Sequence, residues 1–447
     1  MKKRMISLFL AGMMALGATG CGKNAISNSS VDLTENYHGK DTEQSEGENL
    51  TIGAEDPADT EIANYDADAD AEPFDETYVN FSMEMLRHVS ASGENSMISP
   101  LSILTALTMT ENGAAGETLA QMEQVLAGGT PVEQQNIDLT AYMKGLPDTE
   151  LCHMNQANSI WVKNTDDAFT VNEAFLQKNA ETFDAAIYSA PFDEQTLKDI
   201  NTWVSEETEG MIPKMLERIE AETVMFLINA VAFEAEWQET YENYQVREQE
   251  FFHADGTCET VDMMYSEESQ YIEDENTTGF IKPYKDGYSF VAFLPNEGIT
   301  MEDYLVGFSA EKYTNLLGNI NTDVAVNARL PKFTSEFSVV LNESLIDMGM
   351  PLAFEPVEAD FSALGTYNEG YDEGNLYISM VLHKTYINVD EMGTKAGAAT
   401  VVAVDECSTA ILQETKTVVL DRPFVYAIID NENQLPVFIG VVEKIAE

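Results

Sequence analysis

The segment from Val389 to Ser408 reads VDEMGTKAGAATVVAVDECS and carries two conflicting signals. From Thr394 to Val404 it has the small and β-branched residues of a strand inside a sheet, yet acidic residues bracket this run and the polar residues QETK follow at 413–416. The segment is either an ordinary core strand or a loop that becomes an inserted strand in a second state. Because side chains alternate across a sheet, one face of such a strand would carry only uncharged residues: Thr394, Ala396, Ala398, Thr400, Val402 and Val404.

The remainder of the chain predicts one large α+β domain from residue 74 to residue 447. The 447 residues, 44% of them hydrophobic, are enough for a large core, and no repeat or Pro/Gly linker divides this part. Hydrophobic periodicity and capping residues predict helices over 74–89, 99–111 and 197–216, and we expect the first two to lie behind a sheet. Strands are predicted over 157–162, 224–233, 290–294, 324–330, 386–389, 418–420, 424–429 and 436–441, the last two as a hairpin.

The N-terminus has the pattern of an export signal over residues 1–20. Three basic residues precede an apolar run that is too short to span a bilayer permanently, and small residues follow it. Cys21 after these small residues resembles the bacterial lipoprotein processing site, although Ala18 stands where Leu is usual. We therefore expect a lipid anchor at Cys21 that holds the protein outside the cell, on the outer face of the bacterial membrane. A plain secretion signal with an incidental cysteine is the alternative.

Residues 21–73 are predicted to form a disordered acidic tether, and the domain beyond them is itself strongly acidic. The tether carries fourteen acidic residues against two lysines, a net of −12, and the export signal carries +3, so −46 of the total charge of −55 lies on residues 74–447. Such a surface repels nucleic acid and attracts basic proteins, so nucleic-acid partners are not expected. The charge is also explained by solubility alone.

No sequence motif indicates an enzyme, a metal site or a cofactor. The histidines, residues 38, 88, 153, 253 and 383, have no ligand spacing, and no nucleophile elbow or phosphate-binding loop is present. Cys152 and Cys258 are expected to be buried thiols that behave as small apolar residues.

Several short motifs, in order along the chain, resemble the serpin family. The hinge of its reactive-centre loop matches the segment VDEMGTKA at 389–396. The resemblance extends over about residues 74–442. The other matching motifs are NSMISPLSI at 95–103, FLINA at 226–230 with Trp237, LPKF at 330–333, DFS at 360–362, LYIS at 376–379 with His383, and RPF at 422–424.

The resemblance implies a serpin-like fold, with mixed β-sheets, a helical layer and an exposed reactive-centre loop, and it implies roles for particular residues. The shutter is a polar cluster under the main sheet where strands part, and the breach is the place where insertion starts. Glu391 would pair with Lys332 at the breach. The implied residues are Glu391, Gly393, Thr394, Ala396 and Ala398 in the hinge, Ser99, Ser102, Asn229 and His383 in the shutter, and Trp237 with Lys332 at the breach.

The function implied by the resemblance is suicide inhibition of a protease by a monomer. Counting from the hinge glycine places the scissile bond between Cys407 and Ser408, which suits an elastase-like serine protease, with papain-like cysteine proteases as an alternative. The segment between Cys407 and Pro423 is long, so a cut after Glu406 or Thr409 stays open. Two other classes remain: a serpin fold that binds without inhibiting, and a solute-binding lipoprotein.

Overall fold

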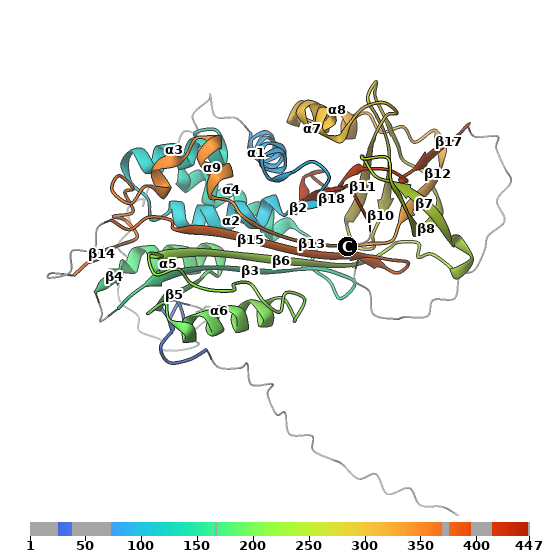
Figure 1. Ribbon diagram of the computed structural model, residues 1–447. Helices are drawn as coiled ribbons and strands as arrows, with labels where there is room; N and C mark the ends of the chain where they lie inside the picture. The colour runs from blue at the N-terminus through green and yellow to red at the C-terminus, as the bar shows by residue number, and fades with distance from the viewer. Residues whose placement is uncertain (1–25, 38–72, 166–167, 369–374, 395–413, 446–447) are drawn as a thin grey trace, which may run out of the picture.

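The computed structural model describes residues 26–37, 73–165, 168–368, 375–394 and 414–445 (Figure 1). Several sequence predictions fall outside these residues: the export signal, Cys21, most of the acidic segment, the hinge residues Ala396 and Ala398, and the Cys407–Ser408 bond. Among the described helices, none combines the length and apolar composition needed to cross a bilayer.

The helices gather mainly on one side of the molecule, as predicted for the first two. Helix α2 begins where Ser99 caps it, with the Ser99 side chain accepting the N–H of Ser102, and Pro100 occupies the first turn. The helices are α1 (Phe74–Val89), α2 (Pro100–Glu111), α3 (Gly116–Ala127), α4 (Val132–Gly145), α5 (Glu173–Phe183), α6 (Glu194–Glu207), α7 (Met301–Gly307), α8 (Ala310–Gly318) and α9 (Asn342–Met348).

Helix α6 is shorter than the predicted helix over 197–216. It ends at Glu207 because the chain turns there: Thr208 is the C-cap, and Glu209 and Gly210 both have positive φ. The amphipathic pattern continues past this point because residues 212–216 still pack on the sheet from an irregular loop.

A central sheet, here sheet A, has the order β1-β5-β3-β6-β16-β15-β13. A six-stranded sheet, β2-β19-β18-β11-β10-β9, and a four-stranded sheet, β17-β12-β8-β7, complete the main framework. The strands of sheet A are β1 (Val31–Asp32), β5 (Ala186–Ala190), β3 (Cys152–Lys163), β6 (Met225–Glu236), β16 (Gly393–Thr394), β15 (Met380–Val389) and β13 (Phe333–Val340). The others are β2 (Ser96–Ile98), β4 (Phe169–Val171), β7 (Val246–Phe252), β8 (Cys258–Glu268), β9 (Tyr271–Glu273), β10 (Thr277–Pro283), β11 (Tyr288–Pro295), β12 (Val324–Pro331), β14 (Gly365–Tyr367), β17 (Glu414–Val419), β18 (Phe424–Asp430) and β19 (Pro436–Val442).

Strand β6 is buried on both faces, as its continuous apolar sequence predicts. Leu227 and Val231 face the large core shared with helices such as α2, whereas Phe226 and Ile228 face a smaller core beneath α6. Helix α6 thus covers the face of sheet A opposite to α1 and α2 (Figure 1). We call this face, with α6, the front. The predicted C-terminal hairpin is also present, as the antiparallel pair β18–β19.

Residues 26–37 differ from the predicted disordered tether because they dock on the domain. Strand β1 pairs antiparallel with β5, and the Leu33 N–H donates to the carbonyl of Ile187 at 2.8 Å. The hydroxyls of Ser27 and Ser30 both donate to the carboxylate of Asp199 on α6, at 2.5 and 2.6 Å. The net charge and low hydrophobicity of this segment favour disorder when it is considered by itself. In the folded protein, the open edge of β5 and the buried carboxylate of Asp199 bind it, and composition does not reveal these partners.

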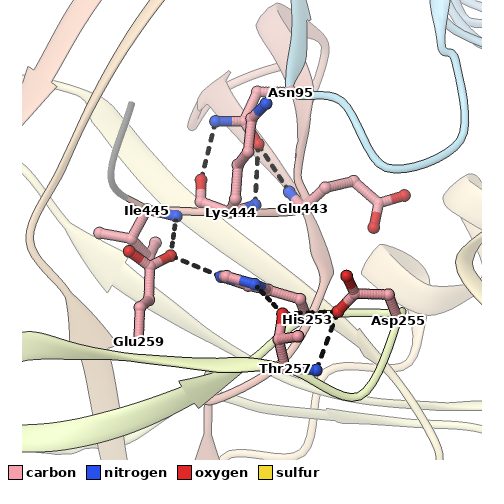
Figure 2. Close-up of polar contacts among 8 residues, drawn as sticks. All are labelled: Asn95, His253, Asp255, Thr257, Glu259, Glu443, Lys444 and Ile445. Carbon is pink, nitrogen blue, oxygen red and sulfur yellow. Dashed lines mark hydrogen bonds and ion pairs between the residues drawn. The ribbon is translucent and has the colours of Figure 1, made fainter.

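The chain end is held by a polar cluster on the β7–β8 hairpin (Figure 2). The His253 ring shares hydrogen bonds with the Thr257 hydroxyl at 2.9 Å and with Glu259 at 2.8 Å. Glu259 also accepts the backbone N–H of Ile445 at 2.7 Å. On the other side of the chain, Asn95 accepts the N–H of Glu443 at 2.7 Å, so both sides of residues 443–445 are fastened.

Candidate functional site

The candidate site begins where the chain leaves β15 and turns back into sheet A. After Val389, the Asp390 carboxylate accepts the N–H groups of Met392 and Gly393 at 2.8 and 3.3 Å, which forms a tight turn. Gly393 and Thr394 then form β16, which lies between β15 and β6 and is antiparallel to both. A Cβ atom on Gly393 would lie 2.0 Å from the carbonyl oxygen of Ala235, so only glycine fits this approach.

Thr394 is fully buried in the gap between the ends of β6 and β15, which we call the slot. Its hydroxyl shares a 2.6 Å hydrogen bond with the hydroxyl of Tyr284. The Tyr284 ring stacks on Trp237 with centroids 4.2 Å apart and planes 7° apart. Trp237 in turn donates its indole N–H to the carbonyl of Asp390 at 2.8 Å. The predicted breach tryptophan therefore contacts the hinge turn directly through its indole nitrogen and is linked to Thr394 through Tyr284.

The structure brings the two predicted hinge charges together, although they are 59 residues apart in the chain. The Lys332 ammonium donates to the Glu391 carboxylate at 2.9 Å. Partial burial disfavours the charged form of both side chains, but the interaction between them outweighs this effect. The hydrogen bond and the negative charge of Glu391 raise the pKa of Lys332, and the hydrogen bond and the positive charge of Lys332 lower the pKa of Glu391. Both side chains are about one-third exposed, so the pair contributes at most about 1 kcal/mol and mainly fixes position.

The four predicted shutter residues form one buried hydrogen-bonded cluster. The N–H of Ser99 donates to Nε2 of His383 at 3.1 Å, and Nδ1 of His383 contacts Oδ1 of Asn229. The Asn229 amide donates to the carbonyl of Ser102 at 2.7 Å. All four residues are fully buried, where an unsatisfied polar atom is costly.

Asn158 on β3 is a fifth member of this cluster and was not among the predicted shutter residues. It accepts the Ser102 hydroxyl at 3.2 Å and also contacts the Asn229 amide. Asn158, Asn229 and His383 occupy matching register positions on β3, β6 and β15, so they form a row across three strands. The predicted strand over 157–162 contains two polar residues, Asn158 and Ser159, and only the strand register shows that Asn158 lies beside Asn229 in this cluster.

The hydrogen bonds of the shutter fix the protonation state of His383. Because Nε2 accepts the N–H of Ser99, the proton must be on Nδ1, where it is donated to Asn229. A second proton on Nε2 would face another donor. Burial lowers the pKa of His383 to about 3, in agreement with a neutral ring.

Two cysteine predictions have different outcomes. Cys152 is buried, and its burial together with nearby acidic groups raises the pKa of its thiol to about 12. Cys258 is exposed, contrary to the prediction, because it begins β8 at the solvent-facing end of the β7–β8 hairpin.

Comparison with known proteins identifies the family. The Serpin (serine protease inhibitor) family model matches residues 76–445. The crystal structure of Tengpin, a thermophilic serpin in the native state, is 43% identical, with a TM-score of 0.80, and covers 93% of this chain and 100% of Tengpin. The chain belongs to the serpin family, and its α+β fold is the serpin fold.

Curated relatives extend this likeness at lower identity. An uncharacterized serpin-like protein of Thermococcus kodakarensis is 29% identical over 367 residues, 81% of this chain and 83% of that protein. The leukocyte elastase inhibitor of Xenopus tropicalis is also 29% identical, over 81% of this chain and 96% of its own length. The family acts on target proteases, and protease inhibitors occur among these relatives.

Acid should weaken the native state through His383. The folded protein resists protonation of this ring down to about pH 3, whereas the unfolded chain takes the proton near pH 6.5. Stability is therefore lost as the pH falls below about 6.5, by about 2 kcal/mol at pH 5. Urea unfolding of the wild type and of His383→Asn at pH 7 and pH 5 checks this, since the carboxylates titrate alike in both. The expected result is a larger loss in the wild type, and equal losses would contradict the assignment.

Proposed function

We propose that this protein is a suicide-type inhibitor of extracellular proteases. The target protease cleaves the reactive-centre loop, stays attached through its acyl-enzyme ester, and is carried along as the freed arm inserts into sheet A. The burial of Thr394 between β6 and β15 supports this most directly. The first residue of the arm already occupies the slot that the following residues would enter.

The arrangement of the strands favours this insertion. β6 and β15 pair in parallel from Phe226 with Met380 to Ala232 with Tyr386, whereas β16 is antiparallel to both. A strand that continues β16 would replace one parallel ladder by two antiparallel ladders, and antiparallel pairing is slightly more stable per residue. Fourteen residues from Thr394 would span about 46 Å, enough to carry the protease toward the far end of the sheet. The native state is then a kinetic trap.

The target class follows from the sequence around the proposed cut. Cys407, a small apolar residue, would fill an elastase-like pocket, and this agrees with the leukocyte elastase inhibitors of Xenopus tropicalis and Equus caballus among the relatives. A papain-like cysteine protease is the alternative target. The acidic domain would favour encounter with basic proteases.

Incubation with a leukocyte-elastase-type protease should give a covalent complex that survives denaturation. We expect the released C-terminal fragment to begin at Ser408, as mass spectrometry would show. A fragment that begins elsewhere corrects the position of the cut. Cleavage by a panel of serine and cysteine proteases with no adduct and no gain in thermal stability would indicate the non-inhibitory class instead.

Thr394→Arg should convert the inhibitor into a substrate. Thr394 is already buried beside Tyr284 before cleavage. Burial of an unpaired guanidinium at this position would cost several kcal/mol, both in the native state and after insertion, so the arginine would stay outside the slot. The stoichiometry of inhibition, measured by titration against the protease, should rise severalfold while the cleavage rate is retained.

Two matched variants separate charge from the loss of the hydrogen bond. Thr394→Ser keeps the hydroxyl that contacts Tyr284, and Thr394→Val keeps the shape without it. Both should inhibit nearly as well as the wild type, since both side chains fit the slot. An unchanged stoichiometry in Thr394→Arg would refute the insertion mechanism for this chain.

We also propose that Cys21 carries a lipid that tethers the protein outside the cell, on the outer face of the bacterial membrane. The support is the sequence alone: a basic, apolar and small-residue order that ends at Cys21. Metabolic labelling with palmitate should mark the wild type and not Cys21→Ser. Equal labelling of the two proteins would place the anchor elsewhere, and no labelling of either would favour simple secretion.

A further inference from the structure

Three side chains that could bind a metal meet on the front face of sheet A, although their spacing in the sequence hides them. They are His153 on β3, Glu234 on β6, and Glu209 in the loop after α6. One nitrogen and two carboxylate oxygens, one from each residue, all lie within 4.8 Å of one another. The sequence predicts no metal site because the spacing of these three residues along the chain does not show that they meet.

The two strand residues are held in place by the sheet. His153 and Glu234 are register partners in the antiparallel β3–β6 ladder, so their side chains leave the same face side by side. That is the face of Ala157 and Phe226, which pack beneath α6. The imidazole Nε2 and the Glu234 carboxylate are 3.9 Å apart, which is too long for a hydrogen bond.

The backbone that carries Glu209 is fixed as well. The N–H of Gly210 donates to the carbonyl of Ser205 at 2.7 Å, and that of Met211 donates to Thr208 at 2.9 Å. These bonds close the C-terminal end of α6, where the helix dipole is negative. The last turn of α6 has no basic residue, so the Glu209 carboxylate lies where a cation is favoured and an anion is not.

We propose that His153, Glu209 and Glu234 form a binding site for a divalent transition-metal ion, with Zn²⁺ as its preferred ligand. One imidazole and two carboxylates are ligands that Zn²⁺ accepts, and a water molecule would complete the tetrahedron. Ligand atoms about 2.0–2.1 Å from the ion lie about 3.4 Å from one another, so small side-chain rotations close the site. The imidazole disfavours Mg²⁺ and Ca²⁺, which prefer oxygen ligands.

The position of the site suggests what the ion would do. The loop that follows α6 continues across sheet A, where the carbonyl of Lys214 accepts the ammonium of Lys384 on β15 at 3.0 Å. A strand that enters between β6 and β15 must displace this loop. An ion that joins Glu209 to β3 and β6 would hold the loop down and slow the insertion, a consequence that rests on the proposed inhibitory function.

Another histidine–glutamate pair in the described structure, His253 with Glu259, provides a contrast (Figure 2). Both of its ring nitrogens are engaged, one by Thr257 and one by Glu259, and Glu259 also holds the backbone of Ile445. This pair therefore fastens the chain end and serves as a matched control for histidine-dependent zinc binding elsewhere on an acidic protein.

Isothermal titration of the purified protein with ZnCl₂ tests the site. We expect one ion per chain, with affinity lowered at least about tenfold in His153→Ala and in Glu209→Gln. Glu209 is exposed, so its substitution does not threaten folding. His253→Ala and Glu222→Gln, an exposed glutamate of the same loop, should bind like the wild type, and MgCl₂ or CaCl₂ should not compete.

The outcomes distinguish the site from its consequence. Equal zinc binding by the wild type, His153→Ala and Glu209→Gln, or no binding by the wild type, would refute the site. If zinc binds as expected, the rate of covalent complex formation with the protease should fall in the wild type and not in Glu209→Gln. A rate independent of zinc would refute the brake on insertion, and absence of any complex would refute the inhibitory function while the zinc titration still decides the site.

Discussion

The parallel pairing of β6 with β15 is the interaction on which the rest of this molecule depends. At its middle, Asn229 and His383 are register partners whose side chains bond to each other across the two strands. That bond satisfies one polar atom of each side chain. The other ring nitrogen of His383 bonds to Ser99, and the amide nitrogen of Asn229 bonds to Ser102, which in turn bonds to Asn158. The strands cannot part without exposing this whole set at once, so the barrier is collective.

At its hinge end, the same pairing is already partly open. β16 separates the tips of β6 and β15, and the Thr394 hydroxyl takes a partner from Tyr284. The stacked Trp237 and Tyr284 rings make this opening rigid, and the Lys332–Glu391 pair fixes the turn above it. A sheet that holds Gly393 and Thr394 between two strands at its end, and a buried polar cluster at its centre, has a defined direction of opening.

The sequence predicted those features that depend on local chemistry or on family motifs. Ser99 and Pro100 predict the start of a helix, and the apolar run of β6 predicts a strand that is buried on both faces. The family motif around Glu391 implies that its ion-pair partner is Lys332. What it could not predict depends on register between distant strands. Asn158 joins the shutter only because it lies beside Asn229 in the ladder, and His153 meets Glu234 and Glu209 for the same kind of reason.

The docking of residues 26–37 limits how far the domain can lie from a lipid at Cys21. Cys21 is only five residues before Ile26, a distance of at most about 18 Å even when the chain is fully extended. A lipid at Cys21 would therefore hold the α6 side of sheet A close to the bilayer. Through the strand register, Asp32 of β1 lies at the position of Phe226 along the sheet, whereas Gly393 pairs with Glu236. These two positions are ten residues apart on β6, so the hinge lies about 33 Å further along the sheet. The protein would then lie with a defined orientation on the membrane.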